Sequence, residues 1–186
     1  MIKELVYKNR NYRKFDQEHE ISHEILLHLV DLARCSPSWS NQQVLRYKIV
    51  NNPKRNAKVF ACTEWANFLP KWDGPAEGER PTAYIVQCSR VSNVKTSFDA
   101  GIACQSILLG ATELGLGGCI IGSIDRERLG EVLDIPQNLD IVLIIALGKP
   151  IEKVVIEELE HGNIKYWRDE NNVHHVPKRS IDEIVF

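Results

Sequence analysis

The stretch from Ser97 to Ser123 limits the possible folds more than any other part of this 186-residue sequence. Between Asp99 and Leu114 it contains no proline, and isoleucine, leucine and alanine leave almost no polar face. Such a pattern is typical of a helix that is buried on most sides. We therefore expect a central helix over this range, with Ser97 as its N-cap and Asp99 in its first turn, where a negative charge is favoured.

The residues that follow this helix predict a short buried strand. Gly115 suits a left-handed helix end, and the run from Leu116 to Gly122 is apolar between glycines. Glycine at the end of a strand lets a ligand approach the backbone closely. Gly101 and Gly110 also leave one side of the helix thin, so another helix backbone can pack there. That helix can come from the same chain or from a second copy, and the sequence leaves both open.

Composition limits the class of protein. The hydrophobic fraction of 44% and charged fraction of 26% are ordinary for one globular domain, which we expect to span residues 1–186. A net charge of -2 argues against nucleic acid or an anionic membrane as the main partner. The first fifteen residues carry charges throughout and lack the apolar core of a signal peptide, so we expect a cytoplasmic location.

The cysteines are widely spaced, and no two have CxxC spacing. We therefore expect reduced core residues rather than a metal or dithiol site. They are Cys35, Cys62, Cys88, Cys104 and Cys119.

Apolar periodicity, caps and breakers predict the remaining elements. The expected helices cover residues 2–8, 19–35, 52–61 and 125–133. The expected strands cover residues 45–50, 81–89 and 141–147, and the last of these has the continuous apolar character of a strand covered on both faces. Residues 151–186 are charged and irregular, so we expect them to lie over the surface of this subunit or a partner.

Residues 9–15 gather basic groups on an irregular segment. Arg10, Arg13 and Lys14 form either a solvated basic turn or an anion site in which guanidinium groups converge on one phosphate. Residues 177–179, near the other end of the chain, are a further source of basic groups for such a site.

Two loops are candidates for ligand contact. Residues 36–43 offer many neutral donors and acceptors around a tryptophan, which suits a polar aromatic ligand, although a plain connection is the alternative. Residues 63–80 combine Trp65, Phe68 and Trp72 with prolines such as Pro70 and with glycines. We interpret this segment as a lid that covers a substrate rather than as a core element, with a surface loop held by hydrophobic contacts as the alternative.

Four segments, in this order along the chain, resemble the flavin-dependent nitroreductase family. The first is NRNYRKF, where the family has RRSxRxF, and the second is PSWSNQQ, where it has PSxxNxQP. The third is DAGIACQSILLGATELGLGGCIIG, where the family has a DxxxAxQ helix, GLG and a short strand. The fourth is ALGKP, which resembles the closing strand. The resemblance covers nearly the whole chain, and it is specific for the family but not for a substrate.

This resemblance implies an α+β fold with a nitroreductase-like mixed β-sheet flanked by helices. It also implies an intertwined homodimer with FMN in each interface cleft, in which residues 151–186 form a C-terminal arm that crosses to the other subunit. Residues 10–13 and the basic tail match positions that hold the flavin phosphate and ribityl chain. Residues 38–41 match the loop that reaches the flavin from the partner, and residues 120–123 match the segment beside the isoalloxazine ring. The implied FMN-binding residues are Arg10, Asn11, Arg13, Ser38, Ser40, Asn41, Ile120, Ile121, Gly122, Ser123, Lys178 and Arg179.

The implied activity is hydride transfer from NADH or NADPH through FMN to an electron-poor acceptor such as a nitroaromatic or a quinone, in a ping-pong reaction. No catalytic residue and no metal are expected, because the cofactor carries the chemistry. Two alternatives stay open: a family relative acting in reductive dehalogenation or flavin breakdown, and a protein that binds flavin without turnover. A cysteine hydrolase would need a base beside an activated thiol, which the sequence cannot place.

Three positions depart from the family pattern. Asn9 stands where the family usually has its first arginine, and Asn11 where it usually has serine. We therefore expect a phosphate site that is less positive or is completed by the tail. Val44 replaces the common proline.

Overall fold

The computed structural model describes residues 1–69 and 72–186, so Pro70 of the predicted lid lies outside the described residues. The helices are α1 (Ile2–Lys8), α2 (His23–Cys35), the 3-10 helix η1 (Trp39–Asn41), α3 (Pro53–Phe60), α4 (Val94–Glu113), α5 (Arg126–Leu133) and α6 (Ile181–Ile184). The strands are β1 (Phe15–Asp16), β2 (Leu45–Val50), β3 (Ala83–Ser89), β4 (Gly117–Ile121), β5 (Asp140–Pro150), β6 (Val154–Glu158), β7 (Trp167–Arg168) and β8 (His174–Lys178).

Strand β5 is the centre of the main sheet. β3 pairs with one edge of β5, and β2 pairs with the outer edge of β3. β4 and β1 also pair with β5, opposite residues 144–148 and 149–150 respectively. These ladders are all antiparallel.

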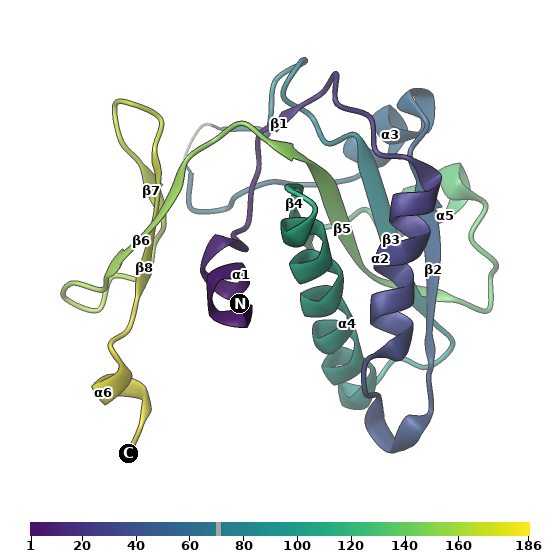
Figure 1. The fold of residues 1–186 in the computed structure, drawn as a ribbon. Helices are drawn as coiled ribbons and strands as arrows, with labels where there is room; N and C mark the ends of the chain where they lie inside the picture. The colour runs from purple at the N-terminus through teal and green to yellow at the C-terminus, as the bar shows by residue number, and fades with distance from the viewer. Residues whose placement is uncertain (70–71) are drawn as a thin grey trace.

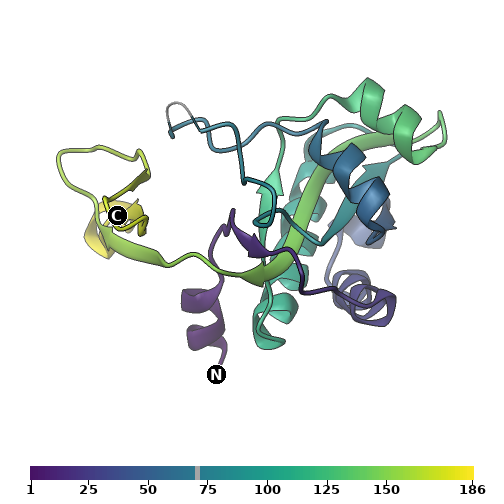
Figure 2. The same cartoon turned by 90° about the horizontal axis from the view of Figure 1, so that it is seen from above.

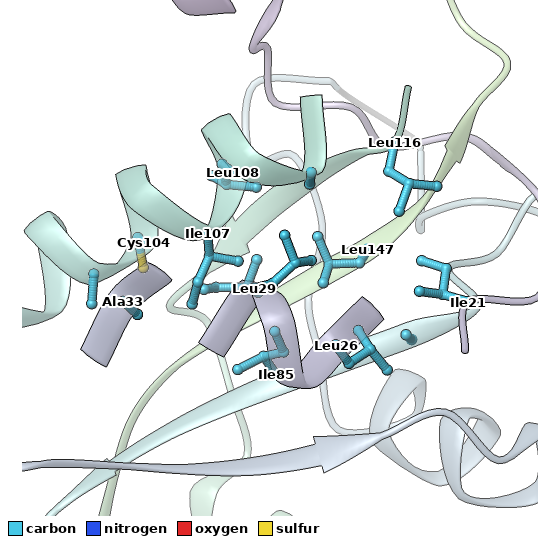
Figure 3. Close-up of a cluster of buried hydrophobic side chains, with 14 residues drawn as sticks. Ile21, Leu26, Leu29, Ala33, Ile85, Cys104, Ile107, Leu108, Leu116 and Leu147 are labelled. Carbon is cyan, nitrogen blue, oxygen red and sulfur yellow. The ribbon is translucent and has the colours of Figure 1, made fainter. Parts of the chain in front are cut away.

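Helices cover both faces of this sheet, as Figures 1 and 2 show. Successive side chains of a strand point to opposite faces, so Ile145 and Leu147 of β5 pack with α2 and α4, while Ile144 and Ala146 pack on the α3 and α5 side. Figure 3 shows the first of these clusters, with Leu147 close to α2 and α4. The prediction of a strand covered on both faces is confirmed.

The start of α4 differs from the prediction. Asn93 is the N-cap, because its side chain accepts hydrogen bonds from the backbone N–H groups of Lys95 and Thr96 at 2.9 and 3.1 Å. The expected cap, Ser97, therefore lies inside the helix, and Asp99 lies beyond the first turn. The prediction for the other end is confirmed, since Gly115 has a φ of 73°.

Part of the glycine-containing side of α4 is covered by another helix of the same chain. A Cβ atom added to Gly110 would lie 2.3 Å from Cδ1 of Leu32, so α2 packs directly on this glycine. Gly101 faces open space within the described part of the chain, and nearby Phe98 and Ile102 are exposed. One face of α4 thus remains uncovered in the single chain.

The segment after β5 carries strands that the sequence reading missed. β6 pairs with β8 in parallel, and β7 pairs with β8 antiparallel. The expectation of an irregular segment was wrong, because these strands are short and rich in charged residues and give no continuous apolar signal. The small sheet stands apart from the main sheet, with α1 on the side facing the body of the molecule (Figures 1 and 2).

All five cysteines are free thiols. The prediction of a core position is confirmed for the four buried ones, Cys62, Cys88, Cys104 and Cys119, and is wrong for Cys35, which is exposed at the end of α2. No helix within residues 1–69 and 72–186 is long and apolar enough to cross a membrane.

Candidate functional site

The basic segment at residues 9–15 runs along the free edge of β4. Asn11 forms a parallel bridge with Gly118, and the backbone N–H of Tyr12 donates to the Gly118 carbonyl at 3.0 Å. The Tyr12 ring fills the space above Gly117, where an added Cβ atom would lie 2.5 Å from the ring. Glycine in β4 therefore lets the basic segment lie directly against this strand.

This arrangement creates a cavity of about 510 Å³, which we call the basic cavity. Arg10, Asn11 and Arg13 line it from the N-terminal segment, and Lys178 lines it from β8. Leu108 of α4 and Ile120 of β4 supply carbon surface, so one cavity combines positive groups with an apolar wall. The side-chain Nε of Arg10 is buried there and has no hydrogen-bond partner within the described residues.

Arg13 is the most buried basic group of this site, with 7% of its surface exposed. Its Nη1 donates to the Asn11 carbonyl at 3.2 Å and lies 3.0 Å from Nε2 of His174. Its guanidinium carbon lies 4.6 Å from the centre of the Tyr166 ring, a cation–π distance. Glu152 accepts hydrogen bonds from the backbone N–H groups of Arg13 and Lys14. The position of Arg13 is therefore set mainly by residues that follow β5.

A second cavity of about 260 Å³ adjoins the first, and we call it the lid cavity. Residues 64–68 line one side of it and residues 119–123 the other, so it includes the predicted segment Ile120–Ser123. Arg13, Ile120 and Tyr166 line both cavities, which makes the two contiguous. Gly122 is exposed, and an added Cβ atom would meet nothing within 4 Å among the described residues.

The three predicted lid residues have different environments. Trp65 lines the lid cavity but is only 6% exposed and belongs to the core cluster with Val59. The expectation that this segment stays out of the core is therefore wrong at Trp65, because its ring packs against α3 and its Nε1 donates to Thr63 Oγ1 at 3.0 Å. Phe68 is exposed at the cavity, whereas Trp72 lies 4.5 Å beneath the guanidinium of Arg168.

The predicted residues of the 38–41 loop lie elsewhere. The loop is joined to the first half of α4, because Trp39 stacks on Phe98 and its backbone N–H donates to Asp99 at 2.7 Å. α4 has 20 residues, so its two ends are separated by about 30 Å, and β4 follows the far end. Within one chain, Ser38, Ser40 and Asn41 therefore do not line the basic cavity. Figure 1 shows β4 at the opposite end of α4 from the segment between α2 and β2.

This loop has an unusual backbone. Ser40, Asn41 and Gln43 have φ values of 49°, 52° and 49°, a left-handed conformation that non-glycine residues rarely adopt. Such strain is kept where the surroundings impose it, often at a functional site.

The tail contributes one of its two candidate residues. Lys178 lines the basic cavity, whereas Arg179 is exposed and pairs with Glu183 at 3.3 Å.

The thiol in the lid cavity is not activated. Burial raises the pKa of Cys119 to about 11, so the thiol is protonated at neutral pH. The lid cavity therefore lacks the thiolate that a cysteine hydrolase requires there.

Tyr166, His174 and Glu152 contribute to this site and were not predicted. Each acts through contacts with residues more than 90 positions away in the sequence, which no local pattern reports. The adjacent pair His174-His175 was a weak signal, since alternation along a strand turns one of them inward. His174 is fully buried beside Arg13, whereas His175 bonds to Glu157 and Asp169.

Comparisons with known proteins identify the class. Residues 6–149 match the family model described as the nitroreductase family, which is more than half of the chain. The oxygen-insensitive NADPH nitroreductase of Helicobacter pylori strain J99 is 26% identical, with 80% of this chain and 87% of that protein covered. The chain therefore belongs to the nitroreductase family, a family of oxidoreductases.

Solved structures agree with this assignment. A nitroreductase family protein from Clostridium novyi NT has a TM-score of 0.67 and 29% identity, covering 81% of this chain and 86% of that one. An FMN-dependent nitroreductase from Clostridium difficile R20291 has a TM-score of 0.64 and 23% identity, covering 82% and 89%. The expected α+β nitroreductase fold is confirmed.

Proposed function

We propose that this protein is an FMN-dependent oxidoreductase that takes electrons from NADH or NADPH and passes them to an electron-poor aromatic acceptor, such as a nitroaromatic or a quinone. The observation that carries the proposal is the pair of contiguous cavities beside Ile120–Ser123 in a member of the nitroreductase family. One cavity is basic, and the other is lined partly by aromatic residues.

The basic cavity suits FMN in size and in donor chemistry. Its volume of about 510 Å³ is within the range of small-molecule sites, roughly 300–1,000 Å³. A phosphate dianion needs fixed positive groups, and the buried, unpaired Nε of Arg10 among the described residues is a donor that a ligand would satisfy. Arg10 and Lys178 would hold the phosphate, Asn11 and Arg13 would hold polar parts of the flavin, and Ile120–Ser123 would lie beside its ring.

When bound, FMN supplies the redox chemistry, accepting a hydride and giving electrons to the second substrate. The residues of the chain would bind and orient the reactants. The backbone at the exposed Gly122 is accessible to a ligand and would be available to stabilise charge at the ring edge. Because the donor and the acceptor would use the same lid cavity in turn, a ping-pong reaction follows.

The site would be completed by a second copy of the chain. Ser38, Ser40 and Asn41 lie near the opposite end of α4 from β4, so they would reach the flavin of a partner rather than that of their own chain. The strained backbone at Ser40 and Asn41 is consistent with a loop that is shaped for a contact. The exposed Phe98 and Ile102 on α4 provide apolar surface for such a homodimer.

An anaerobic titration tests the activity. The FMN-loaded protein should lose its yellow colour on addition of NADH or NADPH and recover it when a nitroaromatic or quinone is added. Bleaching by dithionite but by neither pyridine nucleotide would support flavin binding without turnover. A purified protein that takes up no FMN would overturn the proposal.

A matched pair of variants tests the assignment of the basic cavity. Arg10→Met keeps the aliphatic stem but removes the charge, so FMN affinity should fall by about 10–100-fold in a fluorescence titration. Arg55→Met is the control, because Arg55 lies on α3 and its pairing with Asp134 is loose at 3.9 Å. Equal FMN affinity in the two variants would show that Arg10 does not hold the phosphate.

A further inference from the structure

Arg126, the first residue of α5, holds the chain at the point where β4 leaves the main sheet. The ladder between β4 and β5 ends at Ile121, so Gly122 lies outside it. Nη2 of Arg126 donates to the Gly122 carbonyl at 3.3 Å and to the Val142 carbonyl at 3.2 Å. Its Nε donates to the Ile141 carbonyl at 3.0 Å. One guanidinium group thus ties Gly122 to β5 beyond the last pair of the ladder.

The next carbonyl along the chain is held by the lid segment. The backbone N–H of Glu64 donates to the Ser123 carbonyl at 3.1 Å, and Thr63 forms an antiparallel bridge with Ile124. None of these contacts uses the backbone N–H of Ser123. That N–H has no hydrogen-bond partner among the residues that the structure describes.

The contact with Arg126 fixes the direction of this N–H. The peptide bond between Gly122 and Ser123 is trans, as are the other described peptide bonds, so its C=O and N–H point in opposite directions. Since the C=O is directed to Arg126, the Ser123 N–H is directed away from Arg126 and β5. Gly122 and Ser123 both line the lid cavity. The wall of this cavity therefore has a backbone donor with a fixed direction and no partner in the described structure.

We propose that Arg126 is a positioning residue for the flavin. It holds the Gly122–Ser123 peptide so that the Ser123 N–H meets the edge of the ring, and it thereby raises the affinity for reduced FMN relative to oxidised FMN. This inference rests on the proposed function, which places the ring beside Ile120–Ser123. A donor that is fixed in advance stabilises the negative charge that reduction adds to the ring. Arg126 acts through the peptide, because it lines neither the basic cavity nor the lid cavity.

Three variants separate the direction of the peptide from the charge of the side chain. Arg126→Met removes the charge and the contacts with the three carbonyls. Arg126→Lys keeps the charge but replaces the planar fork of donors with a single ammonium group. Arg128→Met is the matched control, because Arg128 lies on the same helix, is exposed, and makes a long bond of 3.5 Å to the Ala61 carbonyl.

The test is the reduction potential of bound FMN, measured without oxygen against a reference dye. In Arg126→Met and in Arg126→Lys, the ratio of the affinities for reduced and oxidised FMN should fall by about tenfold, which lowers the two-electron potential by about 30 mV. Arg128→Met should keep the natural potential. A merely structural loosening would weaken the binding of both oxidation states equally and leave the potential unchanged.

Hydrogen exchange of the Ser123 amide gives a second readout without turnover. Binding of oxidised FMN should slow this exchange in the natural protein and in Arg128→Met, because the N–H gains a partner. The slowing should be smaller in both Arg126 variants. Equal slowing in all four proteins would contradict the role of Arg126.

The outcomes distinguish this inference from the proposed function. A natural potential in both Arg126 variants, in proteins that NADH or NADPH still bleaches, would overturn the inference and leave the proposed function intact. A fall in Arg126→Met but not in Arg126→Lys, or an equal fall in Arg128→Met, would assign the effect to charge and would also overturn it. Failure of the natural protein to bind FMN would overturn the proposed function together with the inference.

Discussion

The guanidinium of Arg13 donates a hydrogen bond of 3.0 Å to Nε2 of His174, a residue 161 positions away in the sequence. Arginine has no acceptor, so His174 Nε2 must be unprotonated and the proton of the neutral ring must be on Nδ1. Nδ1 is buried and has no partner among the residues that the structure describes. The bond therefore requires a neutral His174. Protonation of this ring would break the contact between the arm and the basic segment.

This requirement predicts an acid-sensitive stability. Burial, followed by the charges of Arg13 and Arg168, lowers the pKa of His174 to about 4 from 6.5. The unfolded chain then binds the additional proton first, so stability present above about pH 6.5 is lost as the pH falls toward 4. The free energy of unfolding, measured with urea, should fall between pH 7 and pH 4.5 in the natural protein. In His174→Gln it should fall by about 2–3 kcal/mol less. Equal losses in the two proteins would contradict the prediction.

Glu152 predicts a large stability effect at the same junction. Its side chain is 2% exposed, accepts from the Lys14 backbone N–H at 3.1 Å, and pairs with Arg168 Nη2 at 2.8 Å. Glu152→Gln would leave the buried Arg168 charge without an opposite charge beside it, at a cost of about 3–5 kcal/mol in urea unfolding. Glu183→Gln is the control, because its pair with Arg179 is exposed and should contribute less than about 1 kcal/mol. Similar losses in both variants would show that the buried pair has no special role.

The sequence predicts the main sheet and its helices because their signals are local. β3 and β5 are largely apolar runs, and β2 alternates apolar and charged residues. α2, α3 and α5 begin after side chains that accept hydrogen bonds from the helix, namely Ser22, Asn52 and Asp125. The start of α4 was misplaced because Asn93 and Ser97 are both acceptable caps, and only the surrounding structure selects the first. The arm strands were missed because strand pairing, rather than an apolar run, defines them.

In the candidate site, too, the residues in local motifs were predicted and those defined by long-range contacts were not. Arg10, Arg13 and Ile120–Ser123 were predicted because they belong to motifs that are short in sequence. Tyr166 and His174 were not, because their roles depend on contacts between segments that meet only in the folded chain. The exposure of a side chain was also not predictable from residue type. Trp65 lies in a segment rich in aromatic residues, proline and glycine that was expected to cover a ligand, yet its side chain is in the core.

Two helical glycines predict opposite responses to alanine. Gly130 in α5 has open space around an added Cβ atom in the described structure, so Gly130→Ala should raise the free energy of unfolding by about 0.5–1 kcal/mol through helix propensity. Gly110 in α4 has Leu32 Cδ1 at 2.3 Å from that position, so Gly110→Ala should lower it by about 1–3 kcal/mol. Urea unfolding measures both. A gain at Gly110 would contradict the close packing of α2 on α4.

Tyr84→Phe is expected not to lower the free energy of unfolding. Its side chain is fully buried, and burial raises the pKa of the phenol, so the hydroxyl is neutral. The hydroxyl has no hydrogen-bond partner within the described residues, although Tyr84 lines a cavity of about 190 Å³ together with Asn56 and Thr82. Tyr84→Phe keeps the ring and removes this unpaired group, so the free energy of unfolding should stay equal or rise by about 1 kcal/mol.

Tyr12→Phe is the matched control for Tyr84→Phe. The Tyr12 hydroxyl donates to the Lys8 carbonyl at 2.9 Å, so its loss should lower the free energy of unfolding by about 0.5–1.5 kcal/mol. Urea unfolding of both variants gives the comparison. A loss at Tyr84 as large as that at Tyr12 would contradict the prediction and would mean that water or another small molecule in the cavity satisfies the Tyr84 hydroxyl, since an unpaired group contributes no hydrogen bond that phenylalanine can remove.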